Sequence, residues 1–543
     1  MLLSRRRARV ERRAADAAER GAVYLDRRLP VFDGGGALVR KAFPDHWSFL
    51  LGELALYSFV VLLLTGVYLT LFFQPGMNEV VYQGTYVPLR DVRMSEAFAS
   101  TLRLSFDVRG GLLIRQVHHW AALVMASAVG VHLLRVFFTG AFRRPREANW
   151  VIGTTLLLLT VLEGFAGYSL PDDLLSGTGL RTAQGFVISV PVAGTYLTMF
   201  LFGGQFPGTD IVSRLYPAHI LLLPGALLAA VVVHLILVFH LKHTQWAGPG
   251  RTNRNVVGKP MFPQFALRSA GLMAAVAGIL FALGAVAQIN PIWAYGPYRP
   301  DQVSTGAQPD WYLGFLEGAI RLLPGFETRL WGHTVNWNPF LPTVVFPVLF
   351  FAALYAYPFL ERWITRDRGE QHLCDRPRDR PARTALGVAG IAFYGLLLLA
   401  GGQDVVAHVL DVSLNRITWT LRIVVILGPL AAFWLTRRVC LGLQAHDAER
   451  LREGDESGEL RQSVEGAYGE SSRPLGDAER RTLLGRRTER PLPVPAGPSA
   501  RRGDRVRAAL SGWYYGDRVP YPGEEPAAPA DAPAGQDVSR RTP

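Results

Sequence analysis

Two pairs of histidines recur at almost the same spacing in two long apolar stretches of the chain. His118 and His132 are fourteen positions apart, and His219 and His234 are fifteen apart. In an α-helix these spacings turn the second side chain by roughly −40° and +60° relative to the first, so each pair lies broadly on one face. An imidazole at membrane depth is costly unless it binds a partner. The pattern therefore indicates ligands, and two stacked haems with two histidine ligands each fit it best.

The direction of the two stretches predicts which histidines share a metal. They are the second and fourth apolar spans, so both run from the outer to the inner side if the N-terminus lies inside. His118 and His219 would then lie near the outer surface, and His132 and His234 deeper. We expect each couple to hold one iron, and filling both axial positions favours electron transfer over oxygen binding. His119 lies about 140° around the helix from His132 and is not expected to be a ligand.

Glycines in the neighbouring spans repeat the histidine spacing. Gly52 and Gly66 are fourteen apart in the first span, and so are Gly153 and Gly167 in the third. Because glycine permits close approach, this recurrence predicts room for two flat porphyrins at the heights of the histidines. Ordinary packing of small residues between membrane helices is the alternative.

Two arginines flank the predicted ligands. Arg115 precedes His118 by three positions, and Arg135 follows His132 by three. Their guanidinium groups could pair with the propionates of bound haems. Taken alone, each would be interpreted as an interfacial arginine whose head group reaches water.

The loop before the sixth span contains a second candidate site. It carries Pro-Asp-Trp-Tyr, with a carboxylate at Asp310 and a phenol at Tyr312, and Glu317 follows Asp310 by seven residues on a similar helix face. A quinol releases protons when it is oxidised, and a carboxylate on a short interfacial helix can accept them. The alternatives are a helix cap at Asp310 and an aromatic belt at Trp311 and Tyr312.

On the inner side, Lys242 and His243 closely follow His234. They could supply protons to a reduced quinone near the inner haem. Equally, they could be positively charged loop residues of the kind that face the cytoplasm.

Eight apolar runs are long enough to cross about 30 Å of hydrocarbon. We therefore expect an all-α polytopic membrane protein with a four-helix di-haem bundle in its N-terminal half. The runs lie near 48–73, 115–138, 149–170, 211–241, 268–289, 339–360, 384–402 and 417–437.

Basic residues indicate the orientation of the spans. Residues 1–47 contain eleven Lys and Arg and residues 361–383 contain seven, whereas residues 171–214 contain only two. Because cytoplasmic segments are enriched in Lys and Arg, we expect a cell-membrane protein with both termini in the cytoplasm. The net charge of +13 then reflects topology and contact with anionic membrane lipid, not nucleic acid. Cys374 and Cys440 lie on the predicted reducing side and are expected to be free thiols.

The composition divides the chain into four expected parts. Residues 1–47 are expected to be a cytoplasmic basic segment and residues 48–241 a di-haem domain. Residues 242–438 are expected to be a second membrane domain with the quinol-site loop, and residues 439–543 a cytoplasmic tail. Residues 1–30 could form an amphipathic surface helix or a solvated charged segment. The tail is charged and then rich in Pro, Ala and Gly, so we expect it to be mostly disordered, with residues 512–522 able to dock on a neighbour.

Together these residues resemble the cytochrome b subunit of respiratory quinol:cytochrome c reductases over roughly residues 40–438. The resemblance rests on the histidines, glycines and arginines above, on Gly-Tyr-Ser-Leu-Pro at 167–171 and on Pro-Asp-Trp-Tyr at 309–312. The fifteen-residue spacing and Phe-Arg-Arg-Pro-Arg-Glu at 142–147 are closer to the plastid-type and Gram-positive branch. The long terminal segments and the excess of Arg over Lys are similar to the actinobacterial form.

The resemblance implies two non-covalent b-type haems, since Leu50 stands where the plastid-type subunit carries a cysteine for an extra covalent haem. It implies oxidation of quinol, in this branch menaquinol, near Asp310, with protons released outside and quinone reduced near the inner haem. The implied partners are a Rieske-type iron–sulfur subunit, a c-type cytochrome, a second copy of the chain and a terminal oxidase. This sequence has no ligand motif for an iron–sulfur cluster or a c-type haem, so those centres would belong to partners.

Two positions depart from the family pattern, and two other protein classes stay open. Asp310 replaces the usual glutamate, which shortens the presumed proton acceptor by one methylene, and Asp172 replaces a common tryptophan. One alternative is a transporter whose histidines relay protons or bind a metal, which the paired glycines disfavour. The other is a haem-binding membrane anchor of a dehydrogenase, which would lack the Asp310 pocket.

Overall fold

The computed structural model describes most of the chain, and the fold is stated for those residues. They are residues 41–204, 208, 210–302, 308–485, 491–495, 501–516 and 518–523. The surface helix considered for residues 1–30, and the basic segment up to residue 40, lie outside the described residues.

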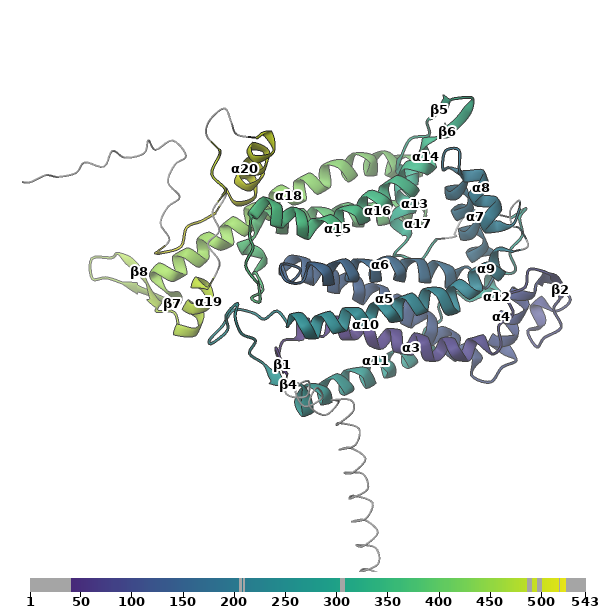
Figure 1. Cartoon of the computed structure of the whole chain (residues 1–543), viewed down its shortest axis with the longest axis horizontal. Helices are drawn as coiled ribbons and strands as arrows, with labels where there is room; N and C mark the ends of the chain where they lie inside the picture. The colour runs from purple at the N-terminus through teal and green to yellow at the C-terminus, as the bar shows by residue number, and fades with distance from the viewer. Residues whose placement is uncertain are drawn as a thin grey trace, which may run out of the picture.

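Eight helices are long and apolar enough to cross a membrane, which confirms the predicted all-α polytopic fold. They lie side by side in Figure 1, as expected where main-chain groups must find partners within their own segment. The first four spans are α3 (Leu51–Thr70), α5 (Gly111–Phe138), α6 (Glu147–Tyr168) and the continuous unit of α9 (Ile211–Pro217), η3 (Ala218–Leu222) and α10 (Leu223–Leu241). The others are η4 (Met261–Phe265) with α11 (Ala266–Val286), α14 (Trp337–Phe340) with η5 (Leu341–Val345) and α15 (Phe346–Thr365), α16 (Pro381–Gly401), and α18 (Leu414–Glu453).

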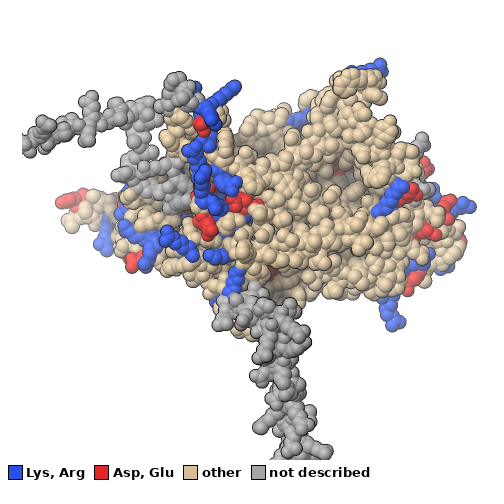
Figure 2. All heavy atoms as spheres, viewed as in Figure 1, with Lys and Arg blue, Asp and Glu red and all other residues tan. Residues whose placement is uncertain are grey.

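Short elements cover the two ends of these spans. The end predicted to be outer, on the right of Figure 1, carries α4 (Glu96–Phe106), α7 (Leu174–Ile188), α8 (Gly194–Phe202), α12 (Ile292–Tyr295), α13 (Gly314–Leu322), α17 (Gln403–Leu410) and two hairpins, β2 (Glu79–Val81) with β3 (Arg93–Ser95) and β5 (Glu327–Leu330) with β6 (His333–Asn336). At the opposite end, β1 (Ala42–Phe43) pairs with β4 (Lys259–Pro260). On the face shown in Figure 2, charged side chains gather at both ends and leave an almost uncharged band between them, as a bilayer requires.

Four spans form one bundle and the later spans form a second group. Helix α3 packs along α5, α6 packs along α10, and α5 contacts α6, while α11 lies against α3 and α5. Buried Phe59, Met125 and Leu227 join α3, α5 and α10 at the centre of the bundle. Helices α16 and α18 pack on each other, and α15 and α16 contact the bundle through α6 and α5. The bundle of the first four spans thus lies where the sequence predicts it.

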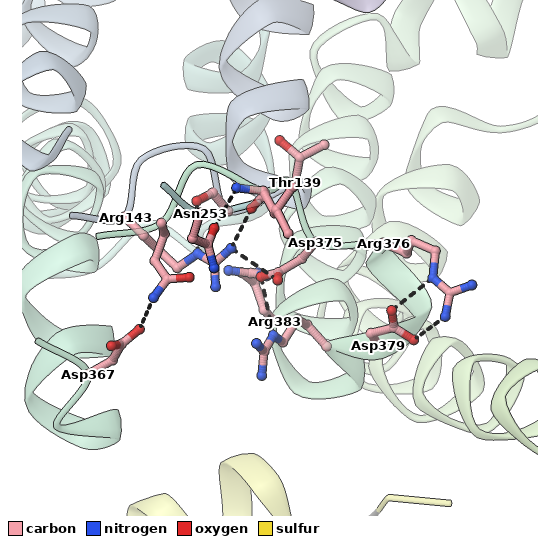
Figure 3. Close-up of polar contacts among 12 residues, drawn as sticks. Thr139, Arg143, Asn253, Asp367, Asp375, Arg376, Asp379 and Arg383 are labelled. Carbon is pink, nitrogen blue, oxygen red and sulfur yellow. Dashed lines mark hydrogen bonds and ion pairs between the residues drawn. The ribbon is translucent and has the colours of Figure 1, made fainter. Parts of the chain in front are cut away.

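An ion-pair cluster locks the loops at the inner end. Asp375 accepts from Arg143 at 3.0 Å and Arg380 at 3.2 Å, and also from Arg383, whose side chain is fully buried. Figure 3 shows Asp375 with Arg383 and the main chain of Thr139, which accepts from the Asp375 amide at 2.9 Å. The cluster joins the α5–α6 loop to the segment that enters α16. Three guanidinium groups hold the pKa of Asp375 well below its usual value, against the opposing effect of burial.

The start of the tail differs from the prediction. Helix α18 continues to Glu453, past the boundary expected at 439, because residues 443–453 contain neither Gly nor Pro. A hairpin of β7 (Asp455–Gln462) and β8 (Tyr468–Arg473) follows, then α19 (Asp477–Leu484) and α20 (Arg502–Tyr515). The described part of the tail is therefore not mostly disordered.

The aromatic segment expected to dock on a neighbour instead packs on its own chain. The hydroxyl of Tyr514 donates to Glu361 of α15 at 2.9 Å, and that of Tyr521 donates to Asp447 of α18 at 3.1 Å. Both tyrosines are buried, so their rings supply the apolar area that the Pro/Ala/Gly-rich composition around them lacks. Cys374 and Cys440 are buried free thiols, as predicted.

Candidate functional site

The structure brings the four histidines together in the predicted pairs. The ring centroids of His118 and His219 are 6.1 Å apart, and those of His132 and His234 are 6.5 Å apart. A metal–imidazole bond is about 2.0–2.1 Å long and adds about 1 Å from nitrogen to ring centre on each side, so two axial imidazoles on one metal have centroids about 6 Å apart. Both pairs therefore have the separation that one shared metal requires.

A π-helical turn explains the extra residue between His219 and His234. Residues Ala218–Leu222 form this turn, in which the Leu223 amide donates to the carbonyl of Ala218, five residues back. Pro224 has no amide hydrogen for the ordinary bond to residue 220, which favours the wider turn. Wider turns of this kind recur at functional sites. The turn at Ala218–Leu222 accommodates the extra residue between the two histidines. His219 therefore faces His118, and His234 faces His132.

Each of the four paired glycines faces one histidine of the adjacent span. A Cβ on Gly52 would lie 3.1 Å from His132, and one on Gly66 would lie 3.4 Å from His118. On α6, a Cβ on Gly153 would lie 3.6 Å from His234. The glycines thus lie at the heights of the histidines, as predicted. The atoms closest to each glycine belong to an imidazole ring, so the absence of a side chain makes room for that ring.

Gly167 is the most crowded of the four. A Cβ there would lie 3.0 Å from both ring nitrogens of His219 and closer still to its Cε1 carbon. Real Cβ atoms essentially never approach that closely, so the outer pair depends on the absence of a side chain at this position.

The two arginines extend the fit to a haem with propionates. Arg135 stacks on Phe49, with its guanidinium carbon 4.2 Å from the ring centroid, and its Nε and Nη2 are buried with no hydrogen-bond partner among the described residues. Arg115 donates to the carbonyl of Asn290 at 2.8 Å and lines the cavity around the outer pair. Unpaired buried donors are costly, so Arg135 in particular fits an anionic group next to the inner pair.

A cavity of about 280 Å³ joins the outer histidine pair to the Pro-Asp-Trp-Tyr loop. Its walls include His118, His219, Asp310 and Tyr312. The Tyr312 hydroxyl donates to Asp310 at 2.9 Å, and Nε2 of His119 lies 3.6 Å from the other carboxylate oxygen. The predicted haem site and the predicted quinol site are therefore one continuous space.

The structure does not support the helix-cap alternative for Asp310. The residue at the start of α13 is Leu313, which makes no side-chain cap, and the Asp310 carboxylate points to Tyr312. Burial, with Asp310 beside it, raises the pKa of Tyr312 well above its usual value, so this phenol remains a donor. Trp311 is 38% exposed, consistent with a place at the membrane interface.

Glu317 lies apart from this cavity. Its carboxylate pairs with Arg321, which also binds Asp404 at 3.0 Å. Burial raises the pKa of Glu317, while Arg321 acts in the opposite direction. Asp310 precedes α13, which begins at Gly314, so the shared helix face expected from the seven-residue spacing is wrong, and the Glu317 carboxylate binds a neighbouring arginine.

Asp172 and Asp173 are buried at the outer end of α6. Asp173 caps α7 and accepts from the Leu175 amide at 3.1 Å, while Asp172 has a positive φ of 53°. Burial raises the pKa of Asp172 to about 7, with Ser95 opposing that shift and Asp173 adding to it. The departure from tryptophan thus places a carboxyl group with a raised pKa next to Asp173, which lines the outer cavity.

The two predicted inner-site residues have different surroundings. Lys242 has an exposed side chain and a φ of 65°, so the chain leaves the helix there. His243 packs on Phe43 with ring centroids 4.6 Å apart. Burial and the nearby cations Lys41 and Arg135 lower the pKa of His243 to about 4, so its imidazole is neutral at neutral pH.

Two residues at the outer pair were missed by the sequence analysis. Glu163 lies within α6, and its Oε1 is 3.0 Å from Nδ1 of His219. Thr65 lies within α3, and its hydroxyl is 2.9 Å from Nδ1 of His118. A carboxylate inside an apolar span was the available signal for Glu163, whereas a threonine in a membrane helix gives no such signal.

The fold and site together define a polytopic helical membrane protein whose central bundle presents two facing histidine pairs. Residues 123–297 match the family model described as cytochrome b(N-terminal)/b6/petB. A cytochrome bc1 complex cytochrome b subunit of Streptomyces coelicolor is 53% identical over 517 residues, which is 94% of each chain. The same subunit of Mycobacterium leprae is 52% identical over 86% of this chain and 84% of its own. A chain of a solved hyperthermophilic respiratory Complex III has a TM-score of 0.56 at 20% identity, covers 76% of this chain and 99% of its own, and supports the fold.

The chain belongs to the family of cytochrome b subunits of cytochrome bc1 complexes, and these relatives are actinobacterial. It is therefore a membrane subunit of a quinol:cytochrome c reductase, and the family implies that it binds haem. This confirms the resemblance seen in the sequence and disfavours the transporter and dehydrogenase-anchor alternatives.

Proposed function

We propose that the chain holds two b-type haems, one between His118 and His219 and one between His132 and His234. The observation that carries this proposal is the pair of imidazole separations, 6.1 and 6.5 Å between centroids. Arg135 would pair with a propionate of the inner haem through its two unsatisfied nitrogens. When bound, haem with two histidine ligands supplies reversible one-electron transfer.

The outer cavity is proposed as the site of quinol oxidation. Asp310 would accept a proton from the quinol hydroxyl, and Tyr312 would hold the carboxylate in place through its 2.9 Å hydrogen bond. Because the cavity also reaches His118 and His219, a quinol there would lie beside the outer haem site. Glu317 is assigned a supporting role through Arg321 and Asp404, not direct contact.

The inner site is proposed near His243 and Lys242. His243 is neutral and can donate one N–H to a quinone oxygen, while the exposed ammonium of Lys242 can supply protons from the aqueous side. The packing of Phe43 on His243 adds an apolar wall for a quinone ring. The excess of basic residues at this end supports a cytoplasmic location for it and for both termini.

Substrate type and partners follow from the family resemblance. Menaquinol is the proposed quinol. The proposed partners are a Rieske-type iron–sulfur subunit, a c-type cytochrome, a second copy of the chain and a terminal oxidase. Support for partners of this kind comes from the absence of iron–sulfur and c-type haem ligand motifs in this sequence.

Replacing one deep histidine tests the haem assignment. His132→Ala should remove the inner haem and spare most of the outer one, because the two pairs lie on separate stretches of α5 and of the unit formed by η3 and α10. Difference spectra of the purified complex, with haem quantified per chain, measure both. Equal loss of both haems in folded protein would contradict the pairing.

Neutralising Asp310 tests the quinol site. Asp310→Asn should slow quinol oxidation by about 10²–10⁴-fold, the usual contribution of a positioned acid or base, and should leave the haem content unchanged. Turnover is measured against pH in membranes that contain the complex. Unchanged turnover across the pH range would show that the carboxylate takes no part in proton transfer.

A further inference from the structure

Arg146 is a buried arginine that none of the roles proposed above includes. It lies in the loop between α5 and α6, within the Phe-Arg-Arg-Pro-Arg-Glu motif at 142–147, and is 7% exposed. Its near neighbour Arg144 is exposed. Because burial strips a guanidinium group of water, a buried arginine is retained where its donors bind specific partners. The partners of Arg146 therefore indicate its role.

The donors of Arg146 join three segments that are far apart in the sequence. Nε donates to the carbonyl of Ala141 at 2.9 Å, within its own loop. Nη1 lies 3.4 Å from the carbonyl oxygens of both Leu241 and Lys242, where α10 ends. Nη2 donates to the carbonyl of Gln371, in the segment that leads to α16. One side chain thus ties the end of α10 to both neighbouring loops.

His372 fixes the orientation of this guanidinium group. The histidine is 1% exposed, and its Nδ1 lies 3.2 Å from Nη1 of Arg146. Because a guanidinium group can only donate, Nδ1 is the acceptor and the ring hydrogen lies on Nε2. Oε2 of Glu370 lies 3.3 Å from that nitrogen and can accept from it. Arg146 is therefore held by an oriented buried ring as well as by main-chain carbonyls.

The main chain at Lys242 requires support of this kind. Its φ is 65° and its ψ is 156°, a combination that is essentially limited to glycine. Another residue persists there only where its surroundings hold it. Three residues later, the fully buried Gln245 donates its amide to the carbonyl of His372 at 2.8 Å. The turn at residues 241–245 is therefore held by Arg146 at one end and by Gln245 at the other.

His243 lies inside this turn, directly after the strained residue. Its Nε2 is buried and has no hydrogen-bond partner among the described residues. A buried polar atom without a partner is costly, which fits a group that binds a ligand. Since Phe43 packs on the ring, the position of this nitrogen follows from the path of the main chain through the turn.

We propose that Arg146 is a positioning residue of the inner quinone site, which holds the turn at Lys242 and so sets where His243 presents its ring to the quinone. The inference rests on the proposed function, because it requires an inner site near His243. Arg146 also acts through its charge, since it lowers the pKa of His243 together with burial, Lys41 and Arg135. A lysine in place of Arg146 keeps that charge, so the geometric role can be tested separately.

Quinone titration of the purified complex tests the inference. Arg146→Lys replaces a planar fork of donors by one ammonium group, which cannot reach acceptors in three segments at once. The complex is reduced and mixed rapidly with a short-chain menaquinone, and the oxidation of the inner haem is followed at each quinone concentration. The apparent affinity should fall by about tenfold or more, since a misplacement of about 1 Å can cost about 10²-fold, and the maximal rate should change less.

Arg144→Lys is the matched control. Arg144 lies in the same loop, is exposed, and donates from Nη1 to the carbonyl of Arg368 at 2.8 Å, outside the turn. Its replacement should leave the apparent affinity for quinone unchanged. An affinity that is unchanged in Arg146→Lys, or lowered equally in both variants, would overturn the inference.

A double-mutant cycle with His243→Ala separates positioning from a general loss of structure. If Arg146 acts through His243, Arg146→Lys should weaken quinone binding much less in the His243→Ala background than in the unmodified protein. Equal effects in both backgrounds would contradict the proposed role of Arg146. If His243→Ala alone leaves the affinity unchanged, the proposed inner site itself fails.

Amide hydrogen exchange of the complex covers the case in which Arg146→Lys does not retain the inner haem. The amides of residues 241–245 should exchange faster in Arg146→Lys than in Arg144→Lys, because the turn opens more often without its support. Equal protection of the turn in the two variants would show that Arg146 does not hold it.

Discussion

The four glycines that face the histidine rings allow a graded test, because the crowding at each is different. Alanine at each position adds one methyl group opposite one histidine ring. The added Cβ would lie 3.6 Å from His234 at Gly153, 3.4 Å from His118 at Gly66 and 3.1 Å from His132 at Gly52. At Gly167 it would lie 3.0 Å from both nitrogens of His219 and closer to the carbon between them. Non-bonded carbon atoms prefer separations of about 3.5–4.0 Å.

These distances set the expected magnitudes. Gly153→Ala and Gly66→Ala add contacts of nearly ordinary length and should be tolerated, since alanine also favours the helix by about 0.5–1 kcal/mol. Gly167→Ala must push the His219 ring back by at least about 0.5 Å. Overpacking of this kind costs about 1–3 kcal/mol, which corresponds to about 5- to 150-fold weaker retention of the outer haem. Gly52→Ala should lie between these cases and act on the inner haem.

Haem content and potential provide the readout for this series. Each variant is purified in its complex, and the two haems are separated by redox titration of the visible difference spectrum. Gly167→Ala should deplete the outer haem alone, and Gly153→Ala should retain both. If Gly153→Ala loses as much haem as Gly167→Ala, or Gly167→Ala loses the inner haem first, the assignment of these glycines to particular histidines is incorrect.

Two further predictions concern buried carboxylates outside the spans. Asp375→Asn should lower the thermal unfolding midpoint of the complex, because it removes the carboxylate shared by Arg143, Arg380 and Arg383, and breaking a buried ion pair costs about 3–5 kcal/mol. An unchanged midpoint would show that the cluster adds no stability. The pKa of Asp172 is about 7 in the folded state, above its value in the unfolded chain. Between about pH 4 and 7 the folded state therefore retains a proton that the unfolded chain loses, so the free energy of unfolding falls as the pH rises through this range. Asp172→Asn should therefore be stabilised relative to the unmodified protein at pH 8 but not at pH 4, as measured by thermal unfolding; equal effects at both values would refute this.

The main features of the fold could be predicted from sequence because they are periodic. Eight apolar runs gave eight spans, and the spacing of His118 and His132 placed both on one face of α5. Because the second and fourth spans run in the same direction, His118 could be paired with His219 and His132 with His234 without any tertiary information. These inferences depend on helix geometry and on the cost of polar groups in hydrocarbon, which act in every membrane helix.

Features that depend on long-range contacts could not be predicted in this way. The order in the tail depends on Tyr514 reaching Glu361, 153 residues earlier, and composition alone does not reveal such a partner. Pro224 favours the π-helical turn before Leu223, but the fifteen-residue spacing alone is equally compatible with a histidine that is rotated away from its partner. Glu317 lies on α13, but Asp310 precedes that helix, so the seven-residue spacing did not place the two on one face, and the Glu317 carboxylate pairs with Arg321.

The link between the two predicted sites depends on a single turn of α6. Gly164 lies against the hydroxyl of Tyr312, so closely that no side chain fits between them. Its neighbour Glu163 contacts His219, and Gly167, one turn later, contacts the same histidine. Residues three and four apart on a helix are neighbours on its surface, so Glu163, Gly164 and Gly167 bring the Tyr312 side of the cavity and the His219 ring onto the same short stretch of α6. The proposed quinol pocket and the outer histidine pair are therefore adjacent because one turn of α6 contacts both.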